Sequence, residues 1–312
     1  MIKEVLTSQE RIKQKIKELK EKEEVIPAIN DSIFKGLFQS KECRKVLSFI
    51  ISYVVDLNEE YVFENLSFKN VELTKENKYE KGKITDLLIE IKGTIINLEM
   101  NQDIYEGTII KNNGYHHKLA GQNLLSGENF EDVKRIIQIN FDYINKFDDR
   151  LVVAFRIMDE TGKYILDKNY INYHINMAKV REKGYNIDNL SKFEKIIMIM
   201  QEKSKKKLLE IAKGEEDLMM MVRKIEELSE DPEILGLYDK EKVDKLVFNI
   251  NMEQCRREST AQGLAEGKAQ GLSEGLVQGK IETAKNMLKK EMDINLISEI
   301  TGLSKEEIEA LN

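Results

Sequence analysis

The chain of 312 residues has no tryptophan, only two prolines and only two cysteines. So few prolines favour a helix-rich chain, because proline interrupts helices. The cysteines, Cys43 and Cys255, are too far apart in sequence to form a metal-ligand cluster, and a single pair makes no disulfide framework. No apolar run approaches the ~20 residues of a membrane span, and the charged N-terminal segment lacks the apolar part of a signal peptide. These absences predict a soluble cytoplasmic protein with two buried, reduced thiols and no membrane partner.

Charge is plentiful but balanced. Charged residues make up 34% of the chain, and the net charge is −7 with acids and bases interspersed. Non-specific DNA affinity comes from clustered lysines and arginines that neutralise phosphates. The chain as a whole therefore does not attract DNA, and any nucleic-acid site must be local.

The middle of the chain is rich in short β-branched and aromatic segments, whereas both ends show helical spacing. We predict strands at residues 61–66, 69–74, 83–92, 94–100, 133–143, 151–158 and 170–178. We predict helices at residues 1–24, 30–55 (one helix or a pair), 103–126, 193–211, 216–228 and 240–258. The expected organisation is a charged N-terminal helix (1–24), an α/β domain with a mixed central sheet (25–183), a helical region (184–258) and a C-terminal segment (259–312).

Five glycines recur at a constant four-residue spacing in the C-terminal segment: Gly263, Gly267, Gly271, Gly275 and Gly279. On a helix this spacing places them along one slowly drifting ridge. Each interior glycine costs roughly 1 kcal/mol relative to alanine. Two interpretations stay open, namely a close helix–helix seam between subunits of a homo-oligomer and a partly frayed linker.

The last twenty residues, DINLISEITGLSKEEIEALN, resemble a small helix-turn-helix with a turn at Gly302. Ser304 and Glu307 have the spacing of a capping box at the start of the second helix. That second helix is acidic, which favours a plain helical hairpin over a DNA reader.

The stretch KITDLLIEIKGTIINLEMNQ carries the residues best suited to chemistry. Asp86 lies in one predicted strand and Glu99 near the end of the next, so a tight hairpin at Gly93 can bring them together. Two carboxylates and the backbone carbonyl of Met100 are the hard oxygen ligands that Mg²⁺ or Mn²⁺ requires. Strand alternation places Asn101 on the same face as Glu99. Both acids sit inside apolar runs, where an unpaired carboxylate is unfavourable, and this favours a metal site over two exposed edge acids.

At these residues the sequence resembles the Rpn family of recombination-promoting, transposase-associated nucleases, within the PD-(D/E)XK superfamily. Asp86 matches the first acid of the family pattern and Glu99 the second. Residues 31–38, DSIFKGLF, are similar to the family's N-terminal segment. The helix around Tyr115 and the strand VKRIIQINF at 133–141 match the elements that follow the acids.

The resemblance implies a restriction-endonuclease-like fold and a Mg²⁺- or Mn²⁺-dependent endonuclease that hydrolyses phosphodiesters of DNA. It places Asp86, Glu99 and Asn101 in the catalytic site. The metal ligands would be Asp86, Glu99 and Met100. The alternative is a catalytically inactive protein of the same fold that acts as a DNA-binding or self-assembling module.

One position departs from the family pattern. Where the superfamily has lysine or glutamine, this chain has Asn101, a shorter neutral amide. Lysines that could supply the missing cation are Lys111, Lys118 and Lys35. Glu90 lies an even number of residues from Asp86 and can share its face, but the family motif does not include it.

Overall fold

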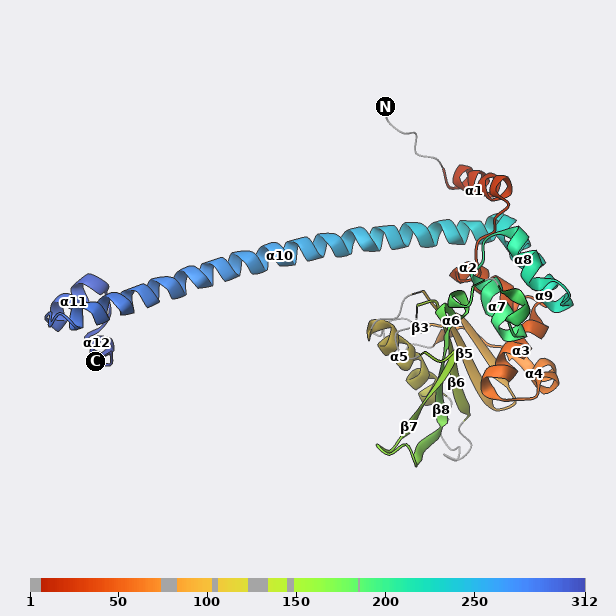
Figure 1. The fold of residues 1–312 in the computed structure, drawn as a ribbon, viewed down its shortest axis with the longest axis horizontal. Coiled ribbons are helices and arrows are strands. Elements are labelled where there is room, and N and C mark those ends of the chain that lie inside the picture. Colours follow the sequence, from red (N-terminus) through yellow and green to blue (C-terminus); the bar gives the residue numbers. More distant parts are fainter. Residues whose placement is uncertain are drawn as a thin grey trace. The chain divides into compact units, whose positions relative to one another are not determined.

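A computed structural model describes residues 7–73, 83–102, 106–122, 134–144, 149–184 and 186–311 (Figure 1). The chain divides into two compact units, Met1–Glu241 and Lys242–Asn312. Within the described ranges, no helix is both long enough and apolar enough to cross a membrane.

A six-stranded sheet forms the centre of the first unit. Its strands, in spatial order, are β1 (Leu66–Phe68), β4 (Leu87–Ile91), β5 (Thr94–Asn101), β6 (Arg135–Asp142), β8 (Ile165–Asn176) and β7 (Val152–Met158). The β5, β6 and β8 strands are mutually parallel, and the other neighbours pair antiparallel. A separate two-stranded ribbon joins β2 (Glu72–Leu73) and β3 (Lys83–Ile84). The mixed sheet confirms the predicted α/β class.

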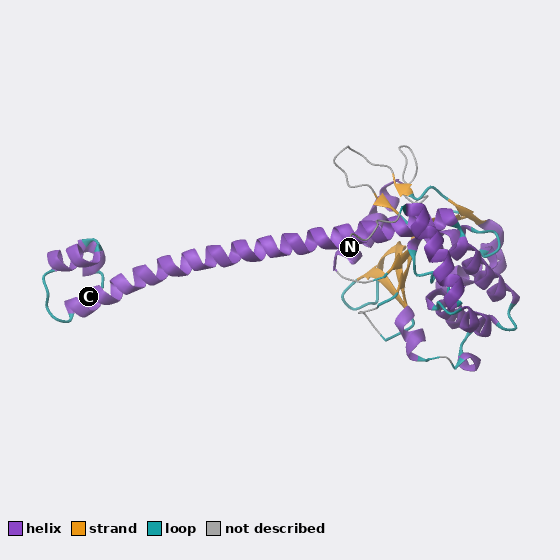
Figure 2. Cartoon of the chain, turned by 90° about the horizontal axis from the view of Figure 1, so that it is seen from above, coloured by secondary structure: helices purple, strands orange, loops and turns teal. Residues whose placement is uncertain are grey.

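Helices cover both faces of this sheet (Figures 1 and 2). One face packs into the main core with helices from before and after the sheet: α1 (Ser8–Lys22), α2 (Asp31–Gln39), α3 (Arg44–Val55), α4 (Glu59–Asn65), α6 (Met177–Glu182), α7 (Lys192–Gln201), α8 (Lys205–Ala212) and α9 (Glu216–Glu230), with a short 3-10 turn at Ile187–Asn189. The opposite face is covered by α5 (Glu106–Gln122). The helix predicted at 103–126 is thus confirmed over its described part, while residues 103–105 and 123–126 lie outside the described ranges.

The main core is apolar and holds a cluster of aromatic rings. Phe34 and Phe38 of α2 meet at 5.1 Å between ring centroids, and Phe34 meets Phe141 of β6 at 5.6 Å. All three side chains are fully buried. Edge-to-face pairs of this kind add to the burial of apolar area, so α2 is fixed on the sheet next to the carboxyl end of β6.

A two-residue turn joins β4 to β5. Lys92 and Gly93 have φ angles of 32° and 82°, and Ile91 pairs directly with Thr94. Positive φ at both positions suits the twist of a tight hairpin, and glycine adopts it without strain. The predicted hairpin at Gly93 is confirmed.

The strand predicted at 61–66 is wrong, because these residues lie mainly in helix α4. Asn58 accepts a hydrogen bond from the Tyr61 N–H at 2.9 Å and so caps the helix, and Glu59 and Glu60 occupy its first turn. A cap and acidic residues stabilise a helix N-terminus. This local stabilisation outweighs the strand preference of the aromatic residues.

The single helix predicted at 193–211 is two helices, α7 and α8. Between them the Glu202 carboxylate accepts hydrogen bonds from the N–H groups of Lys203 and Ser204, both at 2.8 Å. The carbonyl of Lys203 accepts from the Val25 N–H at 2.8 Å. Pairing with the chain between α1 and α2 therefore replaces the helical hydrogen bonds at this break.

One of the two thiols differs from expectation. Cys43 is buried, as predicted, and burial raises its pKa to about 11. Cys255 is exposed. It lies on a helix in a stretch where its neighbours are exposed as well, so the prediction of two buried thiols is wrong for this one.

The C-terminal part of the chain is helical. Helix α10 (Pro232–Leu288) includes the segment with five glycines, and α11 (Ile294–Thr301) and α12 (Lys305–Glu309) follow. Ala284, Ile297 and Ile308 form a small buried cluster of their own. The predicted capping box of Ser304 and Glu307 is present.

Candidate active site

Asp86 and Glu99 lie directly beside each other at one edge of the β4–β5 hairpin. The prediction that Asp86 lies inside a strand is wrong, because the residue lies in the bend between β3 and β4. The Leu87–Leu98 pairing of the hairpin then places it opposite Glu99. The Met100 N–H donates to Asp86 Oδ2 at 2.8 Å, and the Asp86 N–H donates to Glu99 Oε1 at 3.3 Å. Each carboxylate is therefore held by the backbone that carries the other.

Both carboxylates are withdrawn from water. The side chain of Glu99 is 1% exposed and that of Asp86 is 16% exposed. Burial, reinforced by the charges of Glu99 and Asp31, raises the pKa of Asp86 to about 7. Burial also raises the pKa of Glu99. Two neighbouring acids with raised pKa values are typical of functional sites.

Two lysines from opposite faces of the sheet contact this acid pair. Lys111 of α5 places its Nζ 3.3 Å from Glu99 Oε2. Lys35 of α2 places its Nζ 3.4 Å from Asp86 Oδ1 and 2.8 Å from Asp31 Oδ2. Burial lowers the pKa of the Lys111 ammonium, but the charge of Glu99 opposes this and the net pKa is raised. The structure thus brings two of the three candidate lysines to the site.

The third candidate, Lys118, is buried about two turns further along α5 from Lys111. It therefore lies at a different level of the helix from the ion pair that Lys111 makes with Glu99.

Asn101 shares the α5 face of β5 with Glu99, as strand alternation predicts. Its Nδ2 donates to Asp142 Oδ1 at 3.0 Å and to Asn140 Oδ1 at 3.4 Å. Its Oδ1 accepts from Asn112 Nδ2 at 3.4 Å. The amide is therefore engaged with β6 and α5 and not with the two acids.

Asn101 belongs to a buried polar layer that the sequence prediction missed. The layer consists of nine side chains in three aligned rows across the parallel strands: Asn97, Gln138 and Asn172; Glu99, Asn140 and His174; Asn101, Asp142 and Asn176. All nine are buried. A signal was available, because polar residues alternate with apolar ones at 138, 140 and 142 and again at 172, 174 and 176.

A buried histidine–carboxylate contact lies within this layer. His174 Nδ1 lies 2.7 Å from Asp142 Oδ2, and Asp142 Oδ1 accepts from Asn101. Burial raises the pKa of Asp142, and the hydrogen bond with His174 opposes this shift. The layer thus connects the strand that carries Glu99 to the far strand of the parallel set.

The oxygen atoms around the acid pair suit a hard divalent cation. Successive strand residues direct their backbone groups to opposite sides, and the Asn101 carbonyl accepts from Tyr143 on the β6 side. The carbonyl of Met100 therefore faces the β4 side, where its N–H contacts Asp86. Within the described residues no group of three or more acidic, histidine or cysteine side chains could hold an ion. Two carboxylates and a carbonyl fit Mg²⁺, which commonly takes one or two carboxylates and completes its shell with water and phosphate.

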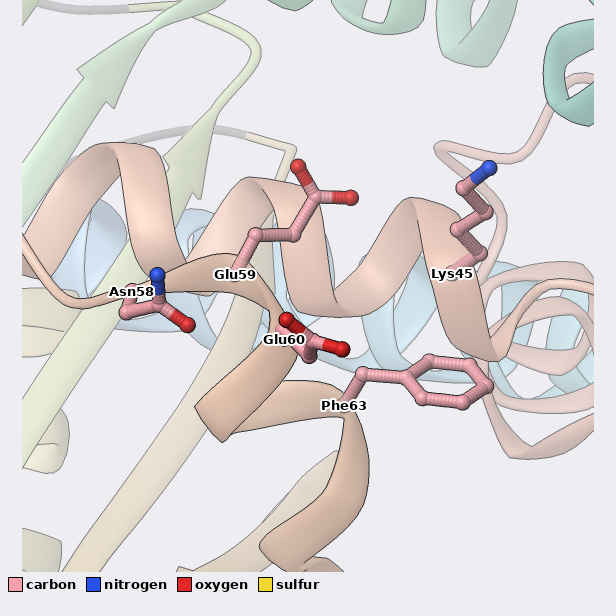
Figure 3. Close-up of a pocket in the computed structure, with 5 residues that line it drawn as sticks. All are labelled: Lys45, Asn58, Glu59, Glu60 and Phe63. Carbon is pink, nitrogen blue, oxygen red and sulfur yellow. The ribbon is translucent and has the colours of Figure 1, made fainter.

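A surface pocket elsewhere on the first unit shares no residue with this site. Figure 3 shows its lining side chains, which come from α3 and from the start of α4: Lys45, Asn58, Glu59, Glu60 and Phe63. It contains neither the acid pair nor either of its lysines, so the site is defined by side-chain geometry and not by the pocket.

Comparisons with known proteins agree with the fold. Residues 28–249 match the family described as PD-(D/E)XK nuclease family transposase, and residues 278–312 match the C-terminal HTH domain of the Rpn/YhgA-like nuclease family. Comparisons with curated proteins and with solved structures gave no match. The matches support a nuclease-type function, and the two domains suggest DNA binding; PD-(D/E)XK nucleases generally use divalent metals. The matched families cover most of the chain, which therefore belongs to the PD-(D/E)XK nuclease family transposases, with the C-terminal HTH domain of the Rpn/YhgA-like nucleases.

Proposed function

We propose that the protein is a divalent-metal-dependent endonuclease that hydrolyses phosphodiesters of DNA. The observation that carries the proposal is the contact of Asp86 with Glu99, one partly buried and one fully buried carboxylate, held by each other's backbone and each paired with a lysine. Two neighbouring carboxylates withdrawn from water raise each other's pKa. This arrangement costs folding free energy unless a cation binds there.

In this proposal Asp86, Glu99 and the Met100 carbonyl hold Mg²⁺ or Mn²⁺. Such an ion, when bound, polarises the phosphodiester and increases the acidity of a coordinated water. The hydrogen bonds from the Met100 N–H and the Asp86 N–H fix the orientation of both carboxylates. Preorganised groups of this kind cost no reorganisation during the reaction.

Lys111 supplies the cation that the motif position lacks. The Asn101 amide is neutral and is engaged with its neighbours in the polar layer. The Lys111 ammonium lies at the other oxygen of Glu99 and its side chain is 45% exposed, so it reaches from the acid pair toward solvent and toward an approaching phosphate. Its positive charge would stabilise the charge that develops on the phosphate oxygens.

Plasmid cleavage by the full chain tests this function. We expect nicking with Mg²⁺ or Mn²⁺ and none with EDTA, and we expect Asp86→Ala and Glu99→Ala to abolish it. Lys111→Met should reduce the rate by roughly 100-fold, a typical loss for one charge-stabilising group. Glu90→Gln is the matched control, because Glu90 is a carboxylate of the same hairpin that pairs with Lys69 and Lys134 instead. Cleavage that persists in both alanine variants would reject the assignment.

The alternative is an inactive protein that keeps the fold as a DNA-binding or self-assembling module. It is favoured by Asn101, whose amide is fully used inside the polar layer. It predicts that folded protein shifts DNA in a gel but cleaves neither double- nor single-stranded DNA with any of the metals.

We also propose that α10 mediates self-association. Apart from each glycine's chain neighbours and the nearby backbone of the helix itself, no atom of the described residues lies within 4 Å of the position that a Cβ would occupy at any of its five spaced glycines. On the same helix Leu264, Leu272 and Leu276 are 60%, 68% and 61% exposed. Glycines let helix backbones approach closely, and exposed leucines beside them gain from burial.

Light scattering on the full chain measures this association. Gly271→Phe should reduce the number of subunits per particle, whereas Ser273→Phe, an exposed position of the same helix off the glycine ridge, should not. An unchanged particle mass in the glycine variant would contradict the proposal.

A further inference from the structure

Asn112 ties helix α5 to two strands of the sheet. Its side chain is buried, and its Nδ2 donates to Asn140 Oδ1 of β6 at 2.8 Å and to Asn101 Oδ1 of β5 at 3.4 Å. One amide group therefore contacts both strands of a parallel pair. It makes these contacts from the helix position directly after Lys111.

The acceptors of Asn112 are themselves held in place. Asn140 Nδ2 donates to Asn172 Oδ1 at 2.5 Å and to the Tyr173 carbonyl at 3.0 Å. Its Oδ1 is thereby left as the acceptor, and it receives a hydrogen bond from Gln138 Nε2 at 3.0 Å as well as the one from Asn112. Asn101 donates its Nδ2 to the Asp142 carboxylate at 3.0 Å, which leaves its own Oδ1 for Asn112. The hydrogen-bond partners thus fix the orientation of both amides.

The two halves of α5 are held by different forces. In the C-terminal half, Tyr115 and Leu119 pack with three apolar side chains of the sheet: Leu88, Ile95 and Ile136. In the N-terminal half, Asn112 makes hydrogen bonds. Apolar contact is non-directional, whereas a hydrogen bond weakens steeply when its angle changes. Successive helix residues are about 100° apart around the axis, so the rotation that satisfies Asn112 also sets the direction of Lys111.

We propose that Asn112 is a positioning residue: its hydrogen bonds to Asn101 and Asn140 set the rotation of α5 and thereby hold the Lys111 ammonium on Glu99. The catalytic consequence rests on the proposed nuclease function, but the placement of Lys111 is a property of the fold and can be measured without DNA. The polar layer then acts as the platform on which this part of α5 is oriented.

Cleavage kinetics test the catalytic consequence. In Asn112→Leu we expect kcat to fall roughly 10- to 100-fold, the size that a misplacement of about 1 Å produces. KM for DNA and the midpoint of the metal titration should stay within about twofold, because the proposed metal ligands lie on the hairpin and not on α5. The control is Asn113→Leu, which changes the next residue and, within the described part of the chain, removes a hydrogen bond from Tyr170 Oη at 3.1 Å. Asn112→Ala removes the same contacts without adding bulk and serves if the leucine variant does not fold.

A double-mutant cycle on unfolding tests the placement itself. Lys111→Met should lower the denaturation midpoint, because it leaves Glu99 buried without its cation. In the Asn112→Leu background that shift should fall to about half or less, since Lys111 no longer sits on Glu99. In the Asn113→Leu background it should be unchanged.

The two measurements separate failure of this inference from failure of the proposed function. If the native chain cleaves no DNA, the proposed function fails and the unfolding cycle alone decides the placement. If the native chain is active, an unchanged kcat in folded Asn112→Leu or an unchanged Lys111→Met shift in its background overturns the proposal.

Discussion

The two faces of the central sheet bury their side chains in opposite ways. Toward α2, α3 and the later helices, β5, β6 and β8 present leucine, isoleucine and phenylalanine, and these pack with the main core. Toward α5 the same three strands present the nine residues of the polar layer. Apolar packing tolerates substitutions that conserve volume, whereas a buried polar network rigidifies one arrangement when it is satisfied. The apolar face therefore holds the fold together, and the polar face orients the side chains around the acid pair.

Phe141 and Asn140 are neighbours on β6 that point to opposite faces of the sheet. Substitutions at these two positions should give the largest difference in the free energy of unfolding. Phe141 is fully buried against Phe34, so Phe141→Ala should lower the free energy of unfolding by about 3–5 kcal/mol through lost contacts and a cavity. Asn140→Leu keeps the volume and removes hydrogen bonds, so the loss should be about 1–3 kcal/mol. Urea denaturation of both variants measures the two losses. A larger loss for Asn140→Leu would show that the polar layer, and not the apolar core, carries the stability.

Metal affinity should depend on pH because of the acid pair on the polar face. Burial and the charge of Glu99 raise the pKa of Asp86 to about 7, and a metal needs the ionised form. We expect Mn²⁺ affinity to level off above about pH 8 and to fall about tenfold for each pH unit below about pH 6. Calorimetric titration without DNA measures this dependence. A profile that stays flat down to pH 5 would show that Asp86 is not a ligand.

The same acid should make the metal-free protein less stable at high pH. A pKa that is higher in the folded than in the unfolded chain means that folding favours the protonated form, so stability falls as pH rises from about 4 toward 7. Asp86→Asn removes this penalty and should raise the melting temperature by roughly 5 °C at pH 8 and by little at pH 4. Melting curves in EDTA measure the difference. No gain at pH 8 would mean that Lys35 fully compensates the buried charge.

The contrast between the faces also explains what the sequence could and could not predict. Asp86 and Glu99 were recognisable because each interrupts an apolar run on a predicted hairpin, and the Gly93 turn brings such positions together. Asn140 is not recognisable from the sequence, because a polar residue that alternates with apolar ones in a strand is also typical of a solvent-exposed face. Only the docking of α5 distinguishes the two cases, and that docking is a long-range property of the chain.

Among the lysines, the sequence offers three candidates but does not tell which of them reach the acid pair. Lys35, Lys111 and Lys118 all lie on helices, and a sequence gives a helix's periodicity without its rotation on the sheet. The structure places Lys111 on Glu99 and Lys35 on Asp86. Helix α4 shows the reverse case, since its Asn58 cap is a local signal that decides against a strand.

Glu90, on the α5 side of the sheet, is the carboxylate whose substitution should have the smallest effect. It shares a strand face with Leu88, but its carboxylate meets Lys69 and Lys134, both at 2.5 Å. Hydrogen bonds from Lys134 and Lys69 lower its pKa, so its contribution to stability is present at neutral pH and is lost as pH falls through the lowered value. Glu90→Gln should therefore cost at most about 1 kcal/mol at pH 7, as expected for half-exposed ion pairs, and progressively less as the pH falls through the lowered pKa of Glu90. The metal affinity of Glu90→Gln should equal that of the native chain. A large loss of affinity would mean that cation binding depends on the summed negative charge of this face and not on the geometry of the acid pair.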